Sequence, residues 1–237
     1  MASPEVEHLV RVIRDNAPTG EGWGTGFTAG ESLQRHATAE DLPYLREELE
    51  ACGREQGYLA SVICLILIEL GSAPDILLVV DSLRRPYGRN FYRDAVLGAL
   101  PALVERDPEA AAPIVRDLLA SREPTFREHG AALYPHARGV LPIGPLLDAS
   151  RDYDPDVSVT AFGSLWGNLE LPEVRARFLE ALADPNEVLV ETAIESLSVG
   201  EVVEAVPQLR LLQQHPSGRV RAAAQAALTR LDRLPLK

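Results

Sequence analysis

Apolar residues recur along the chain with a period close to the length of a two-helix repeat. One leucine in each period can be aligned, and successive aligned leucines are 34, 33, 33, 32, 32 and 31 residues apart. They are Leu33, Leu67, Leu100, Leu133, Leu165, Leu197 and Leu228. In most periods the residues four and eight positions earlier are also apolar, and that spacing marks one face of an α-helix. We therefore predict seven helices whose leucine faces form the core.

Each period carries signals for a second helix. A proline stands before a further amphipathic stretch in several periods, and proline suits the first turn of a helix. These prolines are Pro43, Pro113, Pro142, Pro172 and Pro207. Turns such as Tyr153-Asp154-Pro155 and Ala183-Asp184-Pro185 separate the periods. Asp152, Asp154 and Asp156 alternate like the first ligands of a calcium loop, but the rest of that loop is missing, so we expect the aspartates of this turn to cap the next helix. The predicted order is helix, turn, helix, turn.

Two of these turns resemble a known repeat. The segments Asp154-Pro155-Asp156-Val157 and Asp184-Pro185-Asn186-Glu187-Val188 each lead into an apolar helix that contains alanine. They resemble HEAT repeats of the short kind found in bilin-lyase-like proteins. This resemblance implies an all-α, armadillo-like fold, a right-handed α-solenoid of about seven helix-turn-helix HEAT repeats. It implies no reaction, because such folds serve many functions.

The repeats account for most of the chain, which we predict to be a single solenoid domain over residues 1–237. Residues 1–17 are expected to form an N-terminal cap helix with Val6, Leu9, Val10 and Ile13 on one face. Residues 18–30 are expected to form a glycine-rich loop, and residues 31–237 the repeats. The loop is interpreted as a connection; the alternative is a binding loop whose amides hold an anion.

The charge of the chain narrows the class of partner. There are 23 basic and 35 acidic residues, a net charge of −12, which disfavours nucleic acid as a partner. No apolar run is long enough to cross a bilayer, so a membrane is not expected either. Two cysteines, Cys52 and Cys64, are too few for a disulfide framework, and no secretory signal is visible. We predict a cytoplasmic protein with a protein partner.

No reaction centre is predicted from the motifs. The five histidines are scattered without zinc-ligand spacing, and no serine or cysteine has the neighbourhood of a catalytic nucleophile. We therefore expect no enzyme, no catalytic residue, no metal site and no cofactor. His129 is unusual because it stands where other periods have an apolar core residue. A structural role is favoured, and a polar pocket near the fourth repeat is the alternative.

One segment concentrates arginine and aromatic residues in this acidic chain. Tyrosine and arginine are enriched at interface hot spots, so the segment predicts a partner-binding surface. Its candidate residues are Arg84, Arg85, Tyr87, Arg89, Asn90 and Arg93. The alternative is a long turn in which Tyr92 is buried and the arginines pair with surface acids. The sequence leaves both interpretations open.

The leading functional hypothesis is a non-enzymatic protein–protein interaction scaffold that binds along the solenoid surface. A narrower form is a bacterial immunity-type inhibitor whose acidic surface blocks a basic target. The alternative class is an enzyme or chromophore-lyase-related protein with a small-molecule pocket. Neither the identity of the partner nor the oligomeric state follows from the sequence.

Overall fold

The computed structural model describes residues 2–16, 23–88, 91–137 and 139–233. Within those ranges the regular structure is entirely helical. The chain divides into two compact units. Unit 1 comprises residues 1–121 and 136–141, and unit 2 comprises residues 122–135 and 142–237. The expectation of one domain over the whole chain stays a prediction.

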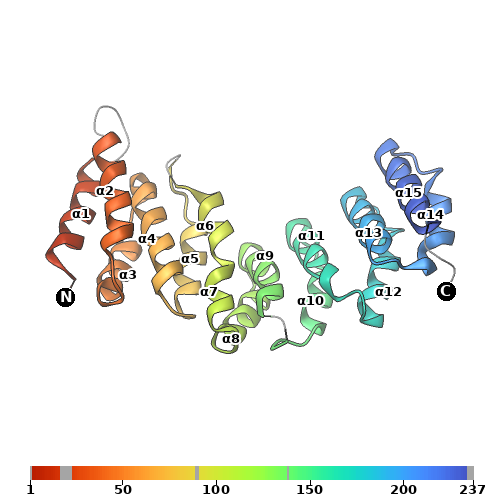
Figure 1. Ribbon diagram of the computed structural model, residues 1–237, viewed down its shortest axis with the longest axis horizontal. Helices are drawn as coiled ribbons and strands as arrows, with labels where there is room; N and C mark the ends of the chain where they lie inside the picture. The colour runs from red at the N-terminus through yellow and green to blue at the C-terminus, as the bar shows by residue number, and fades with distance from the viewer. Residues whose placement is uncertain (1, 17–22, 89–90, 138, 234–237) are drawn as a thin grey trace. The chain divides into compact units, whose positions relative to one another are not determined.

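Unit 1 contains two layers of helices. Its α-helices are α1 (Pro4–Asp15), α2 (Trp23–His36), α3 (Leu42–Ala51), α4 (Gly57–Leu70), α5 (Asp75–Arg84), α6 (Arg93–Ala99), α7 (Pro101–Arg106) and α8 (Pro108–Leu119). Its short 3₁₀ turns are η1 (Ala39–Asp41) and η2 (Arg54–Gln56). Helices α1, α2, α4 and the α6–α7 pair pack in sequence, and α3, α5 and α8 form the second layer (Figure 1).

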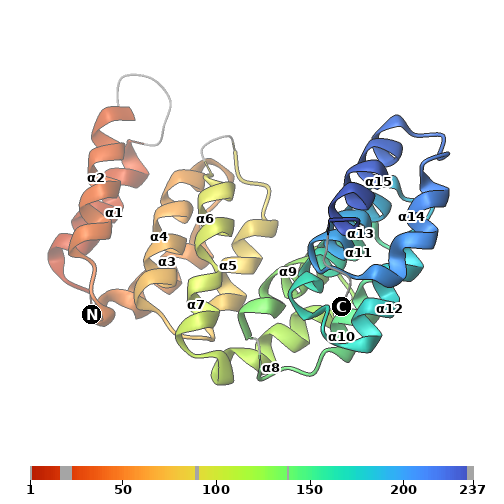
Figure 2. The same ribbon diagram turned by 45° about the vertical axis from the view of Figure 1, so that its right-hand side comes forward.

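Unit 2 repeats the same arrangement. Its α-helices are α9 (Pro124–Leu133), α10 (Gly144–Ala149), α11 (Pro155–Ser164), α12 (Pro172–Ala181), α13 (Glu187–Val199), α14 (Val206–Leu212) and α15 (Gly218–Leu231). Its 3₁₀ turns are η4 (Trp166–Asn168) and η5 (Val203–Ala205). The residues of η3 (Tyr134–Ala137) are divided between the two units, with 134–135 in unit 2 and 136–137 in unit 1. Helices α9, α11, α13 and α15 stack on one another, while α10, α12 and α14 each pack on the next helix (Figure 2).

The aligned leucines form the core, as the period predicts. Leu228 is 6% exposed and the other six are 3% exposed or less. Five of them lie within α2, α4, α9, α13 and α15, whereas Leu100 lies between α6 and α7 and Leu165 directly follows α11. The all-α solenoid fold of stacked helix pairs is therefore confirmed.

Two details of the predicted pattern are wrong. Tyr92, assigned to the buried face of the third repeat, is 39% exposed because α6 begins only at Arg93. Its backbone N–H donates instead to Ser61 Oγ at 2.8 Å. Pro113 does not begin a helix: α8 begins at Pro108, capped by Asp107, and Pro113 lies inside it. The expected helix start was placed too late because two prolines compete in this repeat.

The glycine-rich segment is also different from the prediction. From Trp23 onward it belongs to α2, so only the part before residue 23 can be a connection, and residues 17–22 lie outside the described chain. Glycine allows α2 to approach its neighbours closely. A Cβ at Gly26 would lie 2.8 Å from the carbonyl oxygen of Asn16, and one at Gly30 would lie 2.2 Å from Tyr58 Oη. The glycines therefore serve helix packing. The predicted cap helix is present as α1, with Val6, Val10 and Ile13 buried.

Arginines join successive repeats inside each unit. Arg106 donates to the carbonyls of Gly71, Ile68 and Glu69 at the end of α4, at 2.6–2.8 Å. In unit 2, Arg177 donates to the carbonyl of Ser150 at 2.8 Å. Main-chain carbonyls at a helix end have no partner within the helix, so these guanidinium groups complete both helix ends.

Arg127 makes a related contact through a side chain. It forms a two-pronged ion pair with Asp152, with N–O distances of 2.7 and 2.9 Å, and both side chains are largely buried. The Arg127 guanidinium holds the pKa of Asp152 below its ordinary value. The next aspartate, Asp154, accepts hydrogen bonds from the N–H groups of residues 156 and 157 and caps α11. The prediction that the aspartates of this turn cap a helix is thus confirmed for Asp154.

Candidate functional site

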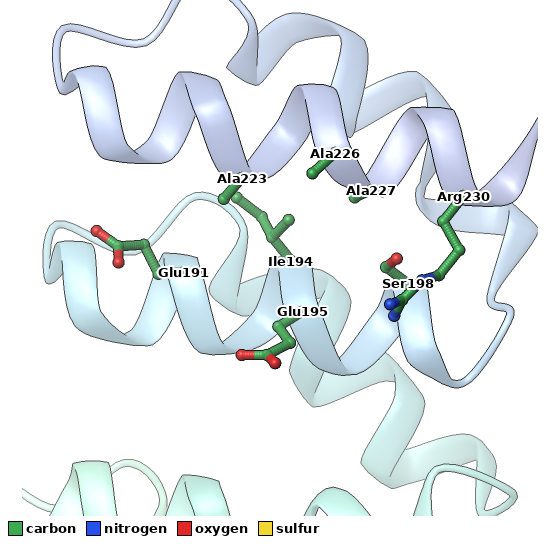
Figure 3. Close-up of a pocket in the computed structure, with 8 residues that line it drawn as sticks. All are labelled: Glu191, Ile194, Glu195, Ser198, Ala223, Ala226, Ala227 and Arg230. Atoms are coloured by element: carbon green, nitrogen blue, oxygen red, sulfur yellow. The ribbon is translucent and has the colours of Figure 1, made fainter.

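A groove lies between α13 and α15 in unit 2. It encloses about 310 Å³ and is lined by side chains from these two helices (Figure 3). The lining residues are Glu191, Ile194, Glu195, Ser198, Ala223, Ala226, Ala227 and Arg230. A volume of this size admits a side chain or two of a binding partner.

Small residues open this groove. Aligned on the core leucines, Ser198 in α13 corresponds to Trp166 in the previous repeat, so a hydroxymethyl group replaces an indole. On the facing helix, Ala223 and Ala227 correspond to Thr192 and Ser196 of α13. All three groove residues are smaller than their counterparts, although Trp166 itself lies in η4 and is 51% exposed. The run of alanines in α15 therefore provides room for a ligand where larger side chains would close the surface.

The floor of the groove is buried and its rim is exposed. Ile194, Ser198 and Ala227 are 1%, 3% and 4% exposed, whereas Glu195 and Arg230 reach solvent. Figure 3 shows the Ser198 and Arg230 side chains next to each other at one end of the groove. In the part of the chain that the structure describes, neither the Ser198 hydroxyl nor the Arg230 guanidinium has a hydrogen-bond partner. Both groups are available to a ligand.

The acidic residues of the rim differ in their contacts. Glu191 lies at the opposite end of the groove from Arg230 and pairs with Arg219 of α15 at 2.7 Å. Glu195, one turn further along α13, has no ion-pair partner among the described residues. The groove thus offers one unpaired carboxylate and one unpaired guanidinium, together with an apolar floor. The carboxylate and the guanidinium can each bind a polar side chain of a ligand, and the apolar floor can hold an aliphatic chain between them.

The predicted arginine segment lies at the end of α5 and before α6 in unit 1. Arg84 pairs with Asp81 at 2.8 Å, and Arg85 pairs with the same carboxylate at 2.9 Å. Arg85 also donates to the carbonyls of Leu49 and Glu50 at 3.1 Å. These two arginines therefore make contacts within the chain.

The rest of that segment is only partly described. Tyr87 is half-buried and stacks on Phe91, with ring centroids 4.9 Å apart, and burial raises the pKa of its hydroxyl. Arg93 is exposed, and its guanidinium carbon lies 5.9 Å from the centre of the Phe91 ring. Arg89 and Asn90 lie outside the described residues. Of the predicted residues, Arg93 is the one that combines exposure with an aromatic neighbour.

The structure also locates His129 and the described part of the glycine-rich segment. His129 is buried in α9, 6% exposed. Within the former glycine-rich loop, Gly24, Thr25, Thr28 and Ala29 line a second cavity of about 520 Å³ between α1 and α2. This cavity is formed by two helices and not by a loop of free amides, so the predicted anion-binding geometry is absent from residues 23–30.

The described residues contain no cluster of three or more histidine, cysteine, aspartate or glutamate side chains suited to a metal ion. Cys52 and Cys64 are both buried and unbridged, and burial raises the pKa of the Cys64 thiol to about 12. None of the described helices has the length and apolar character needed to cross a membrane.

Sequence comparisons leave the chain without a family: no family model matches it, and no curated protein matches its sequence. Solved structures do match. YibA of Escherichia coli aligns over 99% of this chain and 98% of its own, with 16% identity and a TM-score of 0.51. A designed armadillo repeat protein in complex with the peptide (KR)4 aligns over 97% of this chain and 100% of its own, at 16% identity and a TM-score of 0.43. An engineered protein aligns over 97% of both chains, at 16% identity and a TM-score of 0.42. The likeness to YibA shows that this chain has an α-solenoid repeat fold.

Proposed function

We propose that this chain is a non-enzymatic interaction scaffold that holds a segment of a partner protein in the groove between α13 and α15. The observation that carries the proposal is a groove with a buried floor and unpaired polar groups at Ser198, Glu195 and Arg230. Stacked helices hold such a surface rigidly, which lowers the entropy lost when a partner binds. The net charge of −12 favours a partner that is basic overall.

We also propose that the repeats are short HEAT repeats of the bilin-lyase-like kind, on the strength of the Asp-Pro turns before α11 and α13. The buried, unbridged cysteines support action in a reducing compartment such as the cytoplasm. An immunity-type inhibitor of a basic target would fit the same surface and charge. The alternative, an enzyme or lyase relative, would use the groove for a small molecule.

The test is affinity capture with a variant that blocks the groove. Ala226→Arg places a long side chain in the groove at an exposed position of α15, so it should abolish capture without loss of stability. Ala222→Arg is the matched control, because Ala222 is also exposed in α15 but does not line the groove. Captured proteins are identified by mass spectrometry and their affinity is measured with purified components. If Ala226→Arg and Ala222→Arg retain the same partner equally, the groove is not the binding site.

We propose in addition that the arginine segment, predicted as the partner-binding surface, binds an acidic group through Arg93 beside Phe91. Arg93→Glu should leave the fold intact, because Arg93 is exposed, and it should lower the affinity for an acidic group of the partner. Arg85→Glu should instead lower stability, because Arg85 binds Asp81 and the end of α3. Thermal unfolding and partner affinity, measured on both variants, separate the two effects. Unchanged affinity for Arg93→Glu would show that the segment is only a turn.

A further inference from the structure

The groove between α13 and α15 has a polar end whose chemistry indicates what it binds. We infer that Ser198 and Arg230 together bind the carboxylate of an aspartate or glutamate side chain on the partner segment. This inference rests on the proposed function, because it names the group that occupies one end of the same groove.

Ser198 provides the first argument. Its side chain lies at the floor of the groove, in a residue that is only 3% exposed, and it is drawn beside Arg230 in Figure 3. The hydroxyl forms no hydrogen bond with the residues that the structure describes. The residue is fixed in α13 and lines the groove, so its hydroxyl is a positioned donor from which a ligand carboxylate can accept a hydrogen bond.

Arg230 provides the second argument. It is exposed in the last turn of α15, and its guanidinium has no ion-pair partner in the described chain. A guanidinium presents its N–H donors in a planar fork that matches the two oxygens of a carboxylate. With the serine hydroxyl as a further donor, the pair can satisfy a carboxylate from two directions.

The rest of the groove selects a singly charged carboxylate on an aliphatic stem. Ala226 and Ala227 provide an apolar surface for methylene groups. The charge of Glu191 is offset by Arg219 at 2.7 Å, but Glu195 keeps an unpaired negative charge on the rim. That charge repels any anion bound at this end, a doubly charged phosphate more strongly than a singly charged carboxylate, and it favours a basic residue next to the bound acid. The expected occupant is therefore an acidic side chain in a segment that also carries a lysine or arginine.

The experiment uses the full-length chain and three blocked peptides that differ only at the central residue: acetyl-Ala-Ala-X-Ala-Lys-amide, with X as glutamate, glutamine or phosphoserine. Binding is followed by NMR at the Ser198 amide and the Arg230 Nε–Hε group, up to about 10 mM peptide, a range that detects contacts of only a few kcal/mol. The glutamate peptide should shift both signals. The glutamine peptide should bind at least about tenfold more weakly, because the charge-assisted hydrogen bonds are lost.

Variants assign the effect to the two residues. Arg230→Gln should abolish binding of the glutamate peptide, and Ser198→Ala should weaken it by about tenfold. Arg233→Gln is the control, since it removes a nearby positive charge that does not line the groove, and its affinity should stay within about twofold of the wild type. No shift by the glutamate peptide, equal binding of the glutamine peptide, or tighter binding of the phosphoserine peptide would overturn the inference.

Different outcomes would refute the carboxylate contact and the proposed function. If Ala226→Arg abolishes partner capture but Arg230→Gln leaves the affinity unchanged, the groove binds the partner without a carboxylate contact. If neither variant affects capture, the groove itself is not used.

Discussion

The core register can be tested by Leu165→Ala in unit 2. The Leu165 side chain is fully buried at the end of α11, so the substitution removes three carbon atoms from a packed site. At about 0.8 kcal/mol for each buried carbon, the lost burial amounts to roughly 2.4 kcal/mol. The cavity that is left adds to this loss, which places the expected total at about 3–5 kcal/mol.

Leu211→Ala is the matched control for this measurement. It is the same chemical change in the same unit, but Leu211 in α14 is 75% exposed. Its expected cost is below about 0.5 kcal/mol. Both variants and the wild type are unfolded in urea and followed by circular dichroism at 222 nm. If the unfolding midpoints of the two variants are equal, the aligned leucines do not form the core.

Two further predictions concern a glycine and an ion pair. Gly30→Ala should destabilise the protein by about 1–3 kcal/mol despite the higher helix propensity of alanine, because the new Cβ would overlap the Tyr58 hydroxyl. Gly163→Ala in α11 should instead stabilise the protein by up to about 1 kcal/mol, because a Cβ there meets no atom within 4 Å. Thermal unfolding of both variants checks the difference. Asp152 has a lowered pKa because Arg127 donates hydrogen bonds to it, so its stabilising effect is present above the ordinary aspartate pKa and is lost as the pH falls through the lowered value. Asp152→Asn should therefore be less stable than the wild type by about 3 kcal/mol at pH 7, and urea titrations should show this difference shrinking below about pH 4; a constant difference would contradict the assignment.

The repeat and its core could be predicted because burial imposes a strict spacing. A leucine that faces the core must return after each pair of helices, and all seven aligned leucines are buried. Local exceptions could not be predicted in this way. Tyr92 has the right spacing but precedes its helix, and the glycines of α2 suggest a loop although they serve close packing against α1 and α4. The spacing of apolar residues along the sequence indicates which face of a helix is buried, but it does not indicate how closely two helices pack.

The groove was missed because no single segment encodes it. Ser198 and Ala227 are ordinary helix residues when each helix is considered alone. The cavity follows only when small residues coincide on two helices that stack, about one repeat apart in the sequence. Alignment of the repeats contains a signal, since Ala223 and Ala227 are smaller than Thr192 and Ser196 at the same positions of the previous repeat. The arginine segment, in contrast, stood out by composition, although Arg84 and Arg85 bind Asp81.

The hydrogen bonds from arginines to helix ends affect how much the sequences of the repeats can differ. Arg106 and Arg177 bind main-chain carbonyls of the preceding repeat, and every residue type supplies such a carbonyl. Mutations that change the side chains at those helix ends therefore leave the acceptor in place. Successive repeats can drift apart in sequence while their stacking persists, provided that the arginine and the helix end are kept. A chain held together in this way can preserve its architecture after most of its sequence similarity to related proteins has disappeared.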